Sequence, residues 1–166
     1  MNRAPANHTL RILCAAAAGS LLLMLSGCEQ FPRDPRNTLN RVTGGQLIVG
    51  VSENPPWVTA EGESFSGVEP DVLRQFASSV GADITWHQGT ETELVKALKS
   101  GRIDVMAAGL TKDSRWLGDV ALTRPYHGER VMAVPRGENA FISTLERYLT
   151  EHRAEIQQTA ATYLGN

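Results

Sequence analysis

The stretch EPDVLRQFASSVGADITWH, residues 69–87, joins a helical pattern to an extended one. Its first part repeats apolar residues three and four positions apart, which is the spacing of one face of an α-helix. These residues are Val72, Leu73, Phe76, Ala77 and Val80. Pro70 in the first turn and Gly81 after the last apolar residue are typical start and stop signals. Residues 82–87, with Ile84 and Trp86, then favour a strand.

The same alternation continues on both sides of this stretch. Residues 47–51, LIVGV, form an apolar run with the pattern of a strand buried on both faces. Residues 90–93, TETE, supply a capping box for a second helix, and Gly101 ends it. Residues 104–108, DVMAA, are a third apolar run. The order strand, helix, strand, helix, strand predicts parallel strands joined by right-handed crossovers.

The remaining part of the chain predicts two further elements. Residues 131–134 favour a strand that Pro135 stops, and residues 141–164 carry apolar residues along one helical face. That face comprises Phe141, Leu145, Tyr148, Leu149, His152, Ile156, Ala160 and Tyr163. We therefore predict an α/β fold for residues 47–166: a single three-layer lobe with a mostly parallel sheet and flanking helices.

The N-terminal residues 1–27 have the order of a secretory signal peptide. Arg3 and Arg11 precede an apolar stretch that is too short to span a bilayer comfortably. The stretch ends in LSGC, residues 25–28, which resembles the lipobox of bacterial lipoproteins. That resemblance implies cleavage before Cys28 and acylation of its thiol, palmitate included. The alternative is an ordinary signal peptide with a chance cysteine.

Several expectations follow for the processed chain. Residues 28–46 are polar and contain Pro and Gly, so we predict a flexible tether to the membrane. Glu29 replaces the Asp that favours inner-membrane retention in similar lipoproteins, so we expect an outer-membrane anchor facing the periplasm. Cleavage leaves Cys28 as the single thiol, which excludes an internal disulfide. The net charge of −2 and the scattered basic residues argue against nucleic-acid binding.

Four segments resemble a known family in their order and spacing. They are LIVGVSENPPWV (47–58), FSGVEPDVLRQFASSVGADITW (65–86), LVKALKSGRIDVMAAGLTKDSR (94–115) and TRPYHGERVMAVPRG (123–137). They are similar to the first lobe of the bacterial solute-binding proteins of family 3, the amino-acid type, which implies the type II periplasmic-binding fold. Family members feed ABC transporters. The DVMAAGLT stretch also resembles the regulatory domain of membrane-bound lytic murein transglycosylases. Residues 138–166 resemble the family's returning helix, so a second lobe is expected to be absent.

The resemblance also implies a ligand site at the carboxyl ends of the strands, where open α/β sheets bind ligands. Trp57 would present an aromatic wall to the ligand, and the segment containing Phe65 would open the first helix beside it. A structural alternative is that Trp57 covers the edge of the core. For Asp71 we favour a simpler role as a charge that stabilises the N-terminus of the helix.

The most informative part of the implied site is the loop after the third strand. Ala108, Gly109 and Thr111 would offer backbone and hydroxyl groups, and Arg115 would bind the carboxylate of an amino acid through two parallel hydrogen bonds. The spacing from Thr111 to Arg115 is one residue shorter than the family pattern, and the usual carboxylate and phenylalanine after the arginine are replaced at residues 119–122. The alternative is a surface arginine near Asp113 and Asp119.

No catalytic motif is apparent, so we expect no enzyme activity. There is no GxSxG nucleophile elbow and no counterpart of a lytic domain with its catalytic glutamate. His87, His127 and His152 lack the spacing of metal ligands, so neither a metal nor a cofactor is predicted.

Three functions remain open. The first is a lipid-anchored binding protein for a small polar ligand such as an amino acid, which the resemblance connects with an ABC permease. The second is a non-catalytic interaction or regulatory lipoprotein whose cleft docks a partner, either a cell-wall enzyme or a separately encoded lobe. In that case we expect Trp57 and Phe65 to be left exposed, as apolar patches often mark partner sites. The third is a remnant without any ligand.

Overall fold

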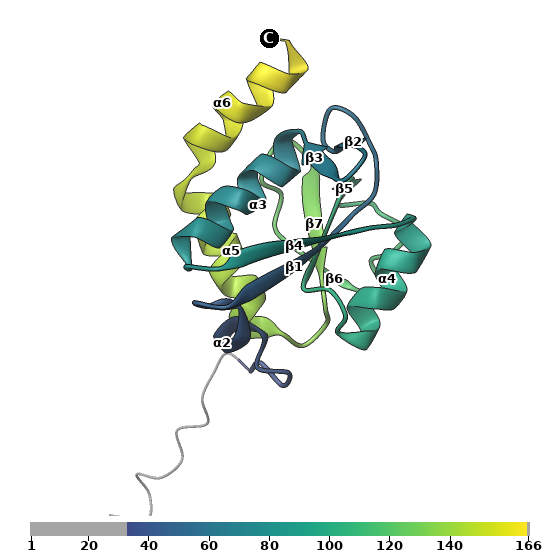
Figure 1. Ribbon diagram of the computed structural model, residues 1–166, viewed down its shortest axis with the longest axis vertical. Helices are drawn as coiled ribbons and strands as arrows, with labels where there is room; N and C mark the ends of the chain where they lie inside the picture. Colours follow the sequence, from purple (N-terminus) through teal and green to yellow (C-terminus); the bar gives the residue numbers. More distant parts are fainter. Residues whose placement is uncertain (1–32, 166) are drawn as a thin grey trace, which may run out of the picture. The chain divides into compact units, whose positions relative to one another are not determined.

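The computed structural model describes residues 33–165 and builds them around a five-stranded sheet (Figure 1). In sheet order the strands are β4 (Asp83–Gln88), β1 (Gln46–Val51), β5 (Val105–Thr111), β7 (Arg130–Val134) and β6 (Ala121–Leu122). β4, β1 and β5 run parallel, whereas β7 and β6 are antiparallel to their neighbours. A separate hairpin pairs β2 (Thr59–Glu61) with β3 (Ser64–Ser66). The predicted signal peptide, residues 1–27, and Cys28 lie outside the described residues.

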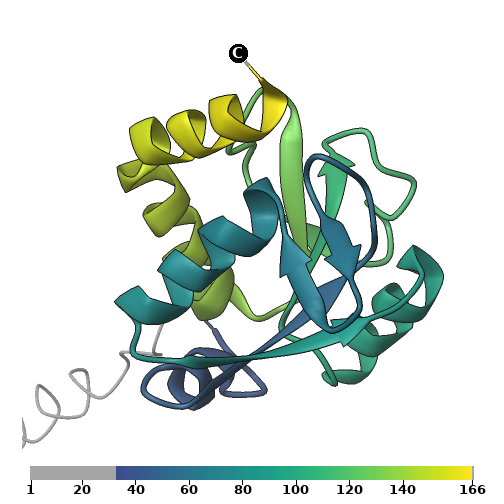
Figure 2. The ribbon, with the colours of Figure 1, turned by 45° about the horizontal axis from the view of Figure 1, so that its top comes forward.

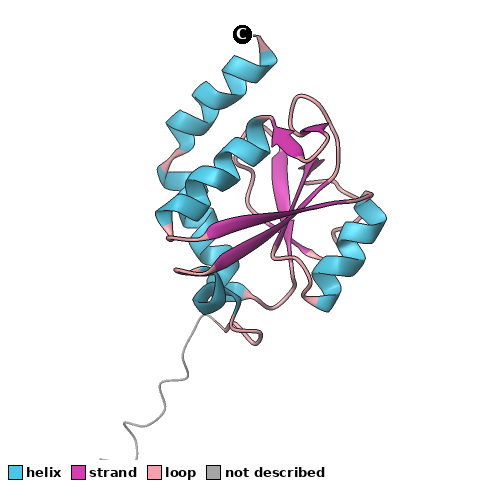
Figure 3. Cartoon of the chain, viewed as in Figure 1, coloured by secondary structure: helices cyan, strands magenta, loops and turns pink. Residues whose placement is uncertain are grey.

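Helices cover both faces of the sheet (Figure 3). Their bounds are α2 (Thr38–Val42), α3 (Val68–Ser79), α4 (Glu91–Ser100), α5 (Asn139–Glu151) and α6 (Arg153–Leu164). α3 and α5 contribute to the core cluster on one face of the sheet, and α4 to the cluster on the other. The predicted three-layer α/β fold with a mostly parallel sheet is therefore confirmed. Within residues 33–165, no helix combines the length and apolarity needed to cross a membrane.

The two central strands explain why this arrangement needs both helical layers. β1 and β5 alternate their side chains between the two core clusters, and most of their residues are buried. Such strands read as continuous apolar runs because both of their faces are covered. Gly50 lets α4 approach β1 closely, because a Cβ at this position would lie 2.4 Å from Cδ1 of Ile103 and 2.9 Å from Cδ2 of Leu94.

Local signals in the sequence are confirmed at several element boundaries. Thr90 and Glu93 form the predicted capping box, in which the Thr90 N–H donates to Oε2 of Glu93 over 2.9 Å. These hydrogen bonds lower the pKa of the Glu93 carboxyl.

Residues 135–138 lead from β7 into α5, at the position where the family resemblance implies a second lobe. The described residues thus form a single lobe.

The last helical stretch differs from the continuous helix predicted over residues 141–164. It breaks at His152, whose backbone lies at φ −101° and ψ 24°. α5 buries Phe141 and Leu145 in the core, and α6 then packs along α3 through Ile156 and Ala160 (Figure 2). Both helices contribute residues to the same core cluster, so the apolar spacing continues across the break. The break itself, where the packing partner changes, leaves no mark in that spacing.

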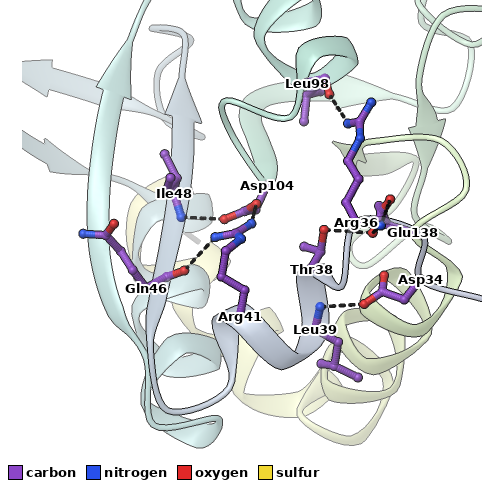
Figure 4. Close-up of polar contacts among 10 residues, drawn as sticks. All are labelled: Asp34, Arg36, Thr38, Leu39, Arg41, Gln46, Ile48, Leu98, Asp104 and Glu138. Atoms are coloured by element: carbon purple, nitrogen blue, oxygen red, sulfur yellow. Dashed lines mark hydrogen bonds and ion pairs between the residues drawn. The ribbon is translucent and has the colours of Figure 1, made fainter.

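The flexible tether predicted for residues 28–46 is wrong for residues 33–46, which contain α2 and are bound to the lobe (Figure 4). Glu138, which is 2% exposed, accepts hydrogen bonds from Oγ1 of Thr38 over 2.9 Å and from the N–H of Arg36 over 3.2 Å. The Arg36 guanidinium donates to the carbonyls of Leu98 and Lys99, at the end of α4. The lobe therefore begins before residue 47.

A second set of contacts joins this segment to the sheet. The Arg41 side chain pairs with the buried carboxylate of Asp104, which also accepts the N–H of Ile48 over 2.9 Å (Figure 4). Burial raises the pKa of Asp34, and the neighbouring Glu138 raises it further. The polar composition of this segment suggested a tether. The prediction failed because the acidic partners of the segment, Glu138 and Asp104, lie about 60 to 100 residues away in sequence.

Replacing Glu138 with Ala tests whether this segment stabilises the lobe. The variant leaves the Thr38 hydroxyl and the Arg36 N–H without their acceptor, so we expect the full chain to lose about 3 kcal/mol of unfolding free energy in urea titrations. Glu151→Ala, which removes an exposed acid at the end of α5, is the control and should change the unfolding free energy by less than about 0.5 kcal/mol. Equal losses in the two variants would show that the contacts of residues 33–46 contribute nothing.

Candidate functional site

The carboxyl edge of the parallel strands carries a hollow of about 320 Å³. Four of the predicted site residues, Ala108, Gly109, Thr111 and Arg115, line it, together with Asn54 and Glu91. Asn54 follows β1, and its side-chain amide donates to the Ala108 carbonyl over 2.9 Å, so the ends of β1 and β5 are joined at the floor of the hollow. The hollow therefore lies where open α/β sheets bind ligands.

Arg115 is the most exposed of the four predicted residues. Its side chain is 71% exposed, its Nη2 lies 3.5 Å from Oε2 of Glu91, and its guanidinium lies 4.5 Å from the centre of the Trp116 ring. It does not take up the alternative pairing with Asp119, since that carboxylate binds Nζ of Lys99 at 2.7 Å. The guanidinium thus borders the hollow with its charge accessible.

Glu91 is a lining residue that the sequence interpretation missed. It lies in the first turn of α4, and its Oε2 accepts the indole N–H of Trp116 over 2.7 Å. The start of α4 and the loop after β5 both belong to the carboxyl edge of the sheet, so residues 91 and 116 meet there. No local motif records this contact; only the predicted strand order could have suggested it.

Trp57 and Phe65 do not line the hollow, and the expectation that they are exposed is wrong. Each is 6% exposed and belongs to the core cluster. Trp57 meets Tyr126 edge to face, with ring centres 6.5 Å apart, and Phe65 lies 5.5 Å from the Trp86 ring. The core of the single lobe thus extends over these rings, in line with the structural alternative for Trp57.

A buried carboxylate holds the strand end that forms the floor of the hollow. Glu69, at the start of α3, is fully buried, and its Oε2 accepts the Gly109 N–H over 3.0 Å. Its Oε1 accepts the hydroxyl of Tyr126 over 2.6 Å. The carbonyl of Gly109 is bound as well, because it accepts from the Arg130 guanidinium. That guanidinium lies 4.5 Å from the centre of the Trp57 ring.

Gly109 is required by this arrangement. Its φ is +60°, and a Cβ there would lie 2.7 Å from Nδ2 of Asn54. The left-handed backbone and the close side chain both exclude larger residues. Gly109, within β5, is therefore held through its N–H by Glu69 and through its carbonyl by Arg130, close to the end of the strand at Thr111.

Burial strongly affects the ionisation of this network. Desolvation raises the pKa of Glu69 from 4.5 to about 7, and the donated hydrogen bonds of Gly109 and Tyr126, with the charge of Arg130, oppose that rise. Burial also raises the pKa of Tyr126 well above its usual value. The sequence contains a signal for Glu69 that we did not use: it precedes Leu73 and Phe76 by one and two helical turns, on the core-facing side of α3.

The other candidate residues lie elsewhere. Asp71 binds Arg74 and the Tyr163 hydroxyl, each at 2.7 Å, and does not reach the hollow. Among residues 33–165, no group of three or more His, Cys, Asp or Glu side chains could hold a metal ion.

Comparison with known sequences identifies related proteins. The model of the bacterial extracellular solute-binding proteins, family 3, matches residues 47–164. The membrane-bound lytic murein transglycosylase F of Vibrio cholerae is 30% identical over 111 residues, which are 66% of this chain and 21% of that protein. A probable histidine-binding protein of Campylobacter jejuni is 24% identical over 123 residues, or 74% of this chain and 48% of that protein. The chain thus spans between about a fifth and a half of the length of these relatives.

Solved structures show the same fold. The arginine-bound form of domain 1 from TmArgBP has a TM-score of 0.61 and 24% identity, over 68% of this chain and 97% of that one. The ancestral amino acid-binding protein AncCDT-1, a precursor of cyclohexadienyl dehydratase, has a TM-score of 0.69 and 11% identity, over 76% of this chain and 98% of that one.

The buried carboxyl of Glu69 generates a pH-dependence prediction. Because its folded-state pKa is raised from 4.5 to about 7, Glu69 contributes stability that is fully present below pH 4.5 and is lost as the pH rises through about 7. That loss amounts to up to about 3 kcal/mol, since one pKa unit corresponds to about 1.4 kcal/mol. We expect Glu69→Gln to flatten the fall in unfolding free energy between pH 5 and pH 7.5, measured by urea titration of the full chain. Parallel curves for the two proteins would contradict the raised pKa.

Proposed function

This chain belongs to the bacterial extracellular solute-binding proteins of family 3, and from that premise we propose that its lobe binds a small polar ligand bearing a carboxylate, such as an amino acid. The observation that carries the proposal is the hollow at the carboxyl edge of β5, which Arg115, Thr111 and Gly109 line together. The accessible guanidinium is suited to a carboxylate, because its planar fork forms two parallel charge-assisted hydrogen bonds.

A single lobe suffices for the proposed binding. The arginine-bound form of domain 1 from TmArgBP, which shares this fold, is a solved structure of one domain with its ligand, and it supports the proposal. The hollow of this chain is open, so it covers a ligand on one side, whereas high-affinity pockets usually bury most of the ligand surface. We therefore expect modest affinity. In this function the lobe binds the ligand and does not convert it chemically.

We further propose that the lobe acts at the cell envelope, anchored through an acylated Cys28 in the outer membrane and facing the periplasm. The backbone carbonyl of Arg33, where the described chain begins, accepts the N–H of Asn139 over 2.8 Å at the start of α5. The following segment binds Asp104, beside the amino ends of β1 and β5. The described chain thus enters the lobe beside the amino ends of β1 and β5, at the edge opposite the hollow.

A second function is favoured by one comparison. The V. cholerae transglycosylase F matches 66% of this chain over a fifth of its own length. A regulatory module that binds cell-wall fragments and acts on a separate cell-wall enzyme would fit that similarity. Docking through exposed aromatic rings loses its support, however, because Trp57 and Phe65 are buried.

Titration of the full chain with the twenty amino acids and with muropeptides tests both functions. A ligand present at a hundred times its dissociation constant should stabilise the protein by roughly 2.7 kcal/mol, which is read as a rise in Tm. We expect Arg115→Ala to abolish that rise, because the variant removes the carboxylate partner. Arg102→Ala removes an exposed arginine that binds Ser100, outside the hollow, and should leave the rise unchanged.

Two results would contradict this proposal. A Tm rise that persists in Arg115→Ala would show that the ligand binds elsewhere. A rise with muropeptides alone would favour the cell-wall function over amino-acid binding.

Metabolic labelling tests the anchor. In cells fed a palmitate analogue, we expect the wild-type chain to be labelled and to sediment with the outer membrane, because an acyl chain at Cys28 inserts into the bilayer. Cys28→Ala should carry no label and should leave the membrane fraction. A Cys28→Ala chain that remains membrane-bound would exclude acylation as the means of attachment.

A further inference from the structure

We propose that the amino edge of the parallel strands carries a basic surface that binds the anionic headgroups of a phospholipid bilayer. We call this surface the basic edge and define it by Arg36, Lys99, Arg102 and Arg136. The inference rests on the proposed function, because it takes the lobe to be anchored to a membrane through Cys28. It adds a contact between the folded lobe and the lipid surface, with the amino edge toward the bilayer.

Three of the four basic side chains come together where α4 ends. Lys99 lies in the last turn of that helix, and Arg102 follows the residue that caps it, Gly101. The Arg36 guanidinium donates to the last two carbonyls of this turn, over 3.2 and 2.8 Å (Figure 4). A Cβ at Gly101 would lie 3.1 Å from Nη1 of Arg36, so Arg36 lies directly over the residue before Arg102.

Arg136 joins the same edge from another part of the chain. It follows β7, which runs antiparallel to β5, so its backbone leaves the sheet at the amino edge of the parallel strands. Its Nη1 donates to the carbonyl of Gly118 over 2.6 Å, and the neighbouring Asp119 binds Nζ of Lys99 over 2.7 Å. Segments that are far apart in sequence thus bring their cations to one place.

The three guanidinium groups of the basic edge keep their charge, because their partners are neutral. Arg36 and Arg136 donate to backbone carbonyls, and Nε of Arg102 donates to the Ser100 hydroxyl over 3.1 Å. Among residues 33–165, the ion pairs between side chains include none of these three arginines. A neutral acceptor holds a guanidinium in place without cancelling its charge, so the edge presents positive charge to its surroundings.

Basic residues elsewhere on the lobe are neutralised. Lys112, after the carboxyl end of β5, binds Glu129 over 2.7 Å, and Nε of Arg124 binds Glu146 over 3.0 Å. The difference between these pairs and the basic edge indicates that the unpaired charge gathers on one side of the lobe.

The acidic residues of the amino edge do little to offset this charge. Asp104 and Glu138 are each 2% exposed and bind partners inside the lobe, and Asp34 is partly buried with a raised pKa. Asp83 is exposed, but it begins β4, which β1 separates from β5. The accessible charge around the end of α4 is therefore positive.

The course of the chain favours a bilayer as the partner. The described chain begins at Arg33, whose carbonyl binds the start of α5, and Cys28 lies five residues earlier in sequence. Because an extended residue spans at most about 3.6 Å, an acyl anchor at Cys28 would hold this edge within about 18 Å of the bilayer. Clusters of Lys and Arg close to a membrane are attracted to anionic lipids. A soluble anionic partner would have to enter the same narrow space.

Hydrogen exchange in lipid nanodiscs tests the basic edge. The full chain is inserted into discs of phosphatidylglycerol with phosphatidylethanolamine, or into neutral discs of phosphatidylcholine, and exchange is followed by mass spectrometry. We expect amides of residues 97–102 to exchange more slowly in the anionic discs by roughly fivefold, the factor that one basic side chain contributes near an anionic surface. The slowing should vanish at about 1 M KCl, where the screening length falls to about 3 Å. Residues 111–115, at the opposite edge, should exchange equally in both discs.

Charge reversal provides the matched variants. Arg102→Glu combined with Arg136→Glu should abolish the slowing, and both positions are exposed, so the variant should fold normally. Lys112→Glu reverses one charge at the opposite edge and should leave the slowing intact. Urea titration of each variant checks that the unfolding free energy is maintained.

Several results would overturn the inference. Equal exchange in the two kinds of disc, or slowing that survives the double charge reversal, would show that the basic edge does not meet the lipid. Stronger slowing by heparin added to neutral discs would indicate a soluble anionic polymer as the partner instead. The anchor is judged separately: palmitate-labelled Cys28 without slowing refutes the basic edge alone, whereas slowing in an unlabelled chain refutes the anchor and supports the basic edge.

Discussion

The buried carboxylate of Glu69 is the contact on which the geometry of the candidate site depends. A carboxylate removed from water is unfavourable unless hydrogen bonds replace its hydration. Here the replacements come from Gly109 in β5 and Tyr126 before β7, so one side chain of α3 joins the end of one strand to the approach of the next. Arg130 completes the arrangement by binding the carbonyl of Gly109. The position of Thr111 at the end of β5, and of the following loop with Arg115, follows from these contacts.

A second constraint is that one lobe must complete its own core. Its apolar surface is closed by α5 on one face and α4 on the other, and Trp57 and Phe65 are covered within the lobe. The polar segment before β1 contributes as well: Arg36 binds the last carbonyls of α4 and Arg41 binds Asp104. These contacts join the elements at the amino edge of the parallel strands. The hollow lies at the carboxyl edge, where Asn54 and Glu69 join the ends of β1, β5 and α3.

Local patterns predicted most of the fold and part of the site. Apolar periodicity and caps identified α3, α4 and the central strands, because those signals act over a few neighbouring residues. They did not predict the break at His152, where the helix changes its packing partner, nor the order of residues 33–46, whose acidic partners are distant in sequence. In the site, Gly109 and Arg115, which the resemblance implied, line one hollow, whereas Trp57 is buried and Glu91 was not anticipated.

The succession of strands and helices and the cap at Thr90 were written in the amino-acid sequence, since each depends on spacing within one segment. The tertiary structure alone decided which charges meet. Glu69 pairs with a residue 40 positions away and Glu91 with an indole 25 positions away. Burial then sets the ionisation of the first carboxylate, and the meeting of α4 with the loop after β5 brings the second to the hollow. No local sequence pattern predicts the burial of Glu69 or the contact of Glu91 with Trp116, because both arise only when the helices pack against the sheet.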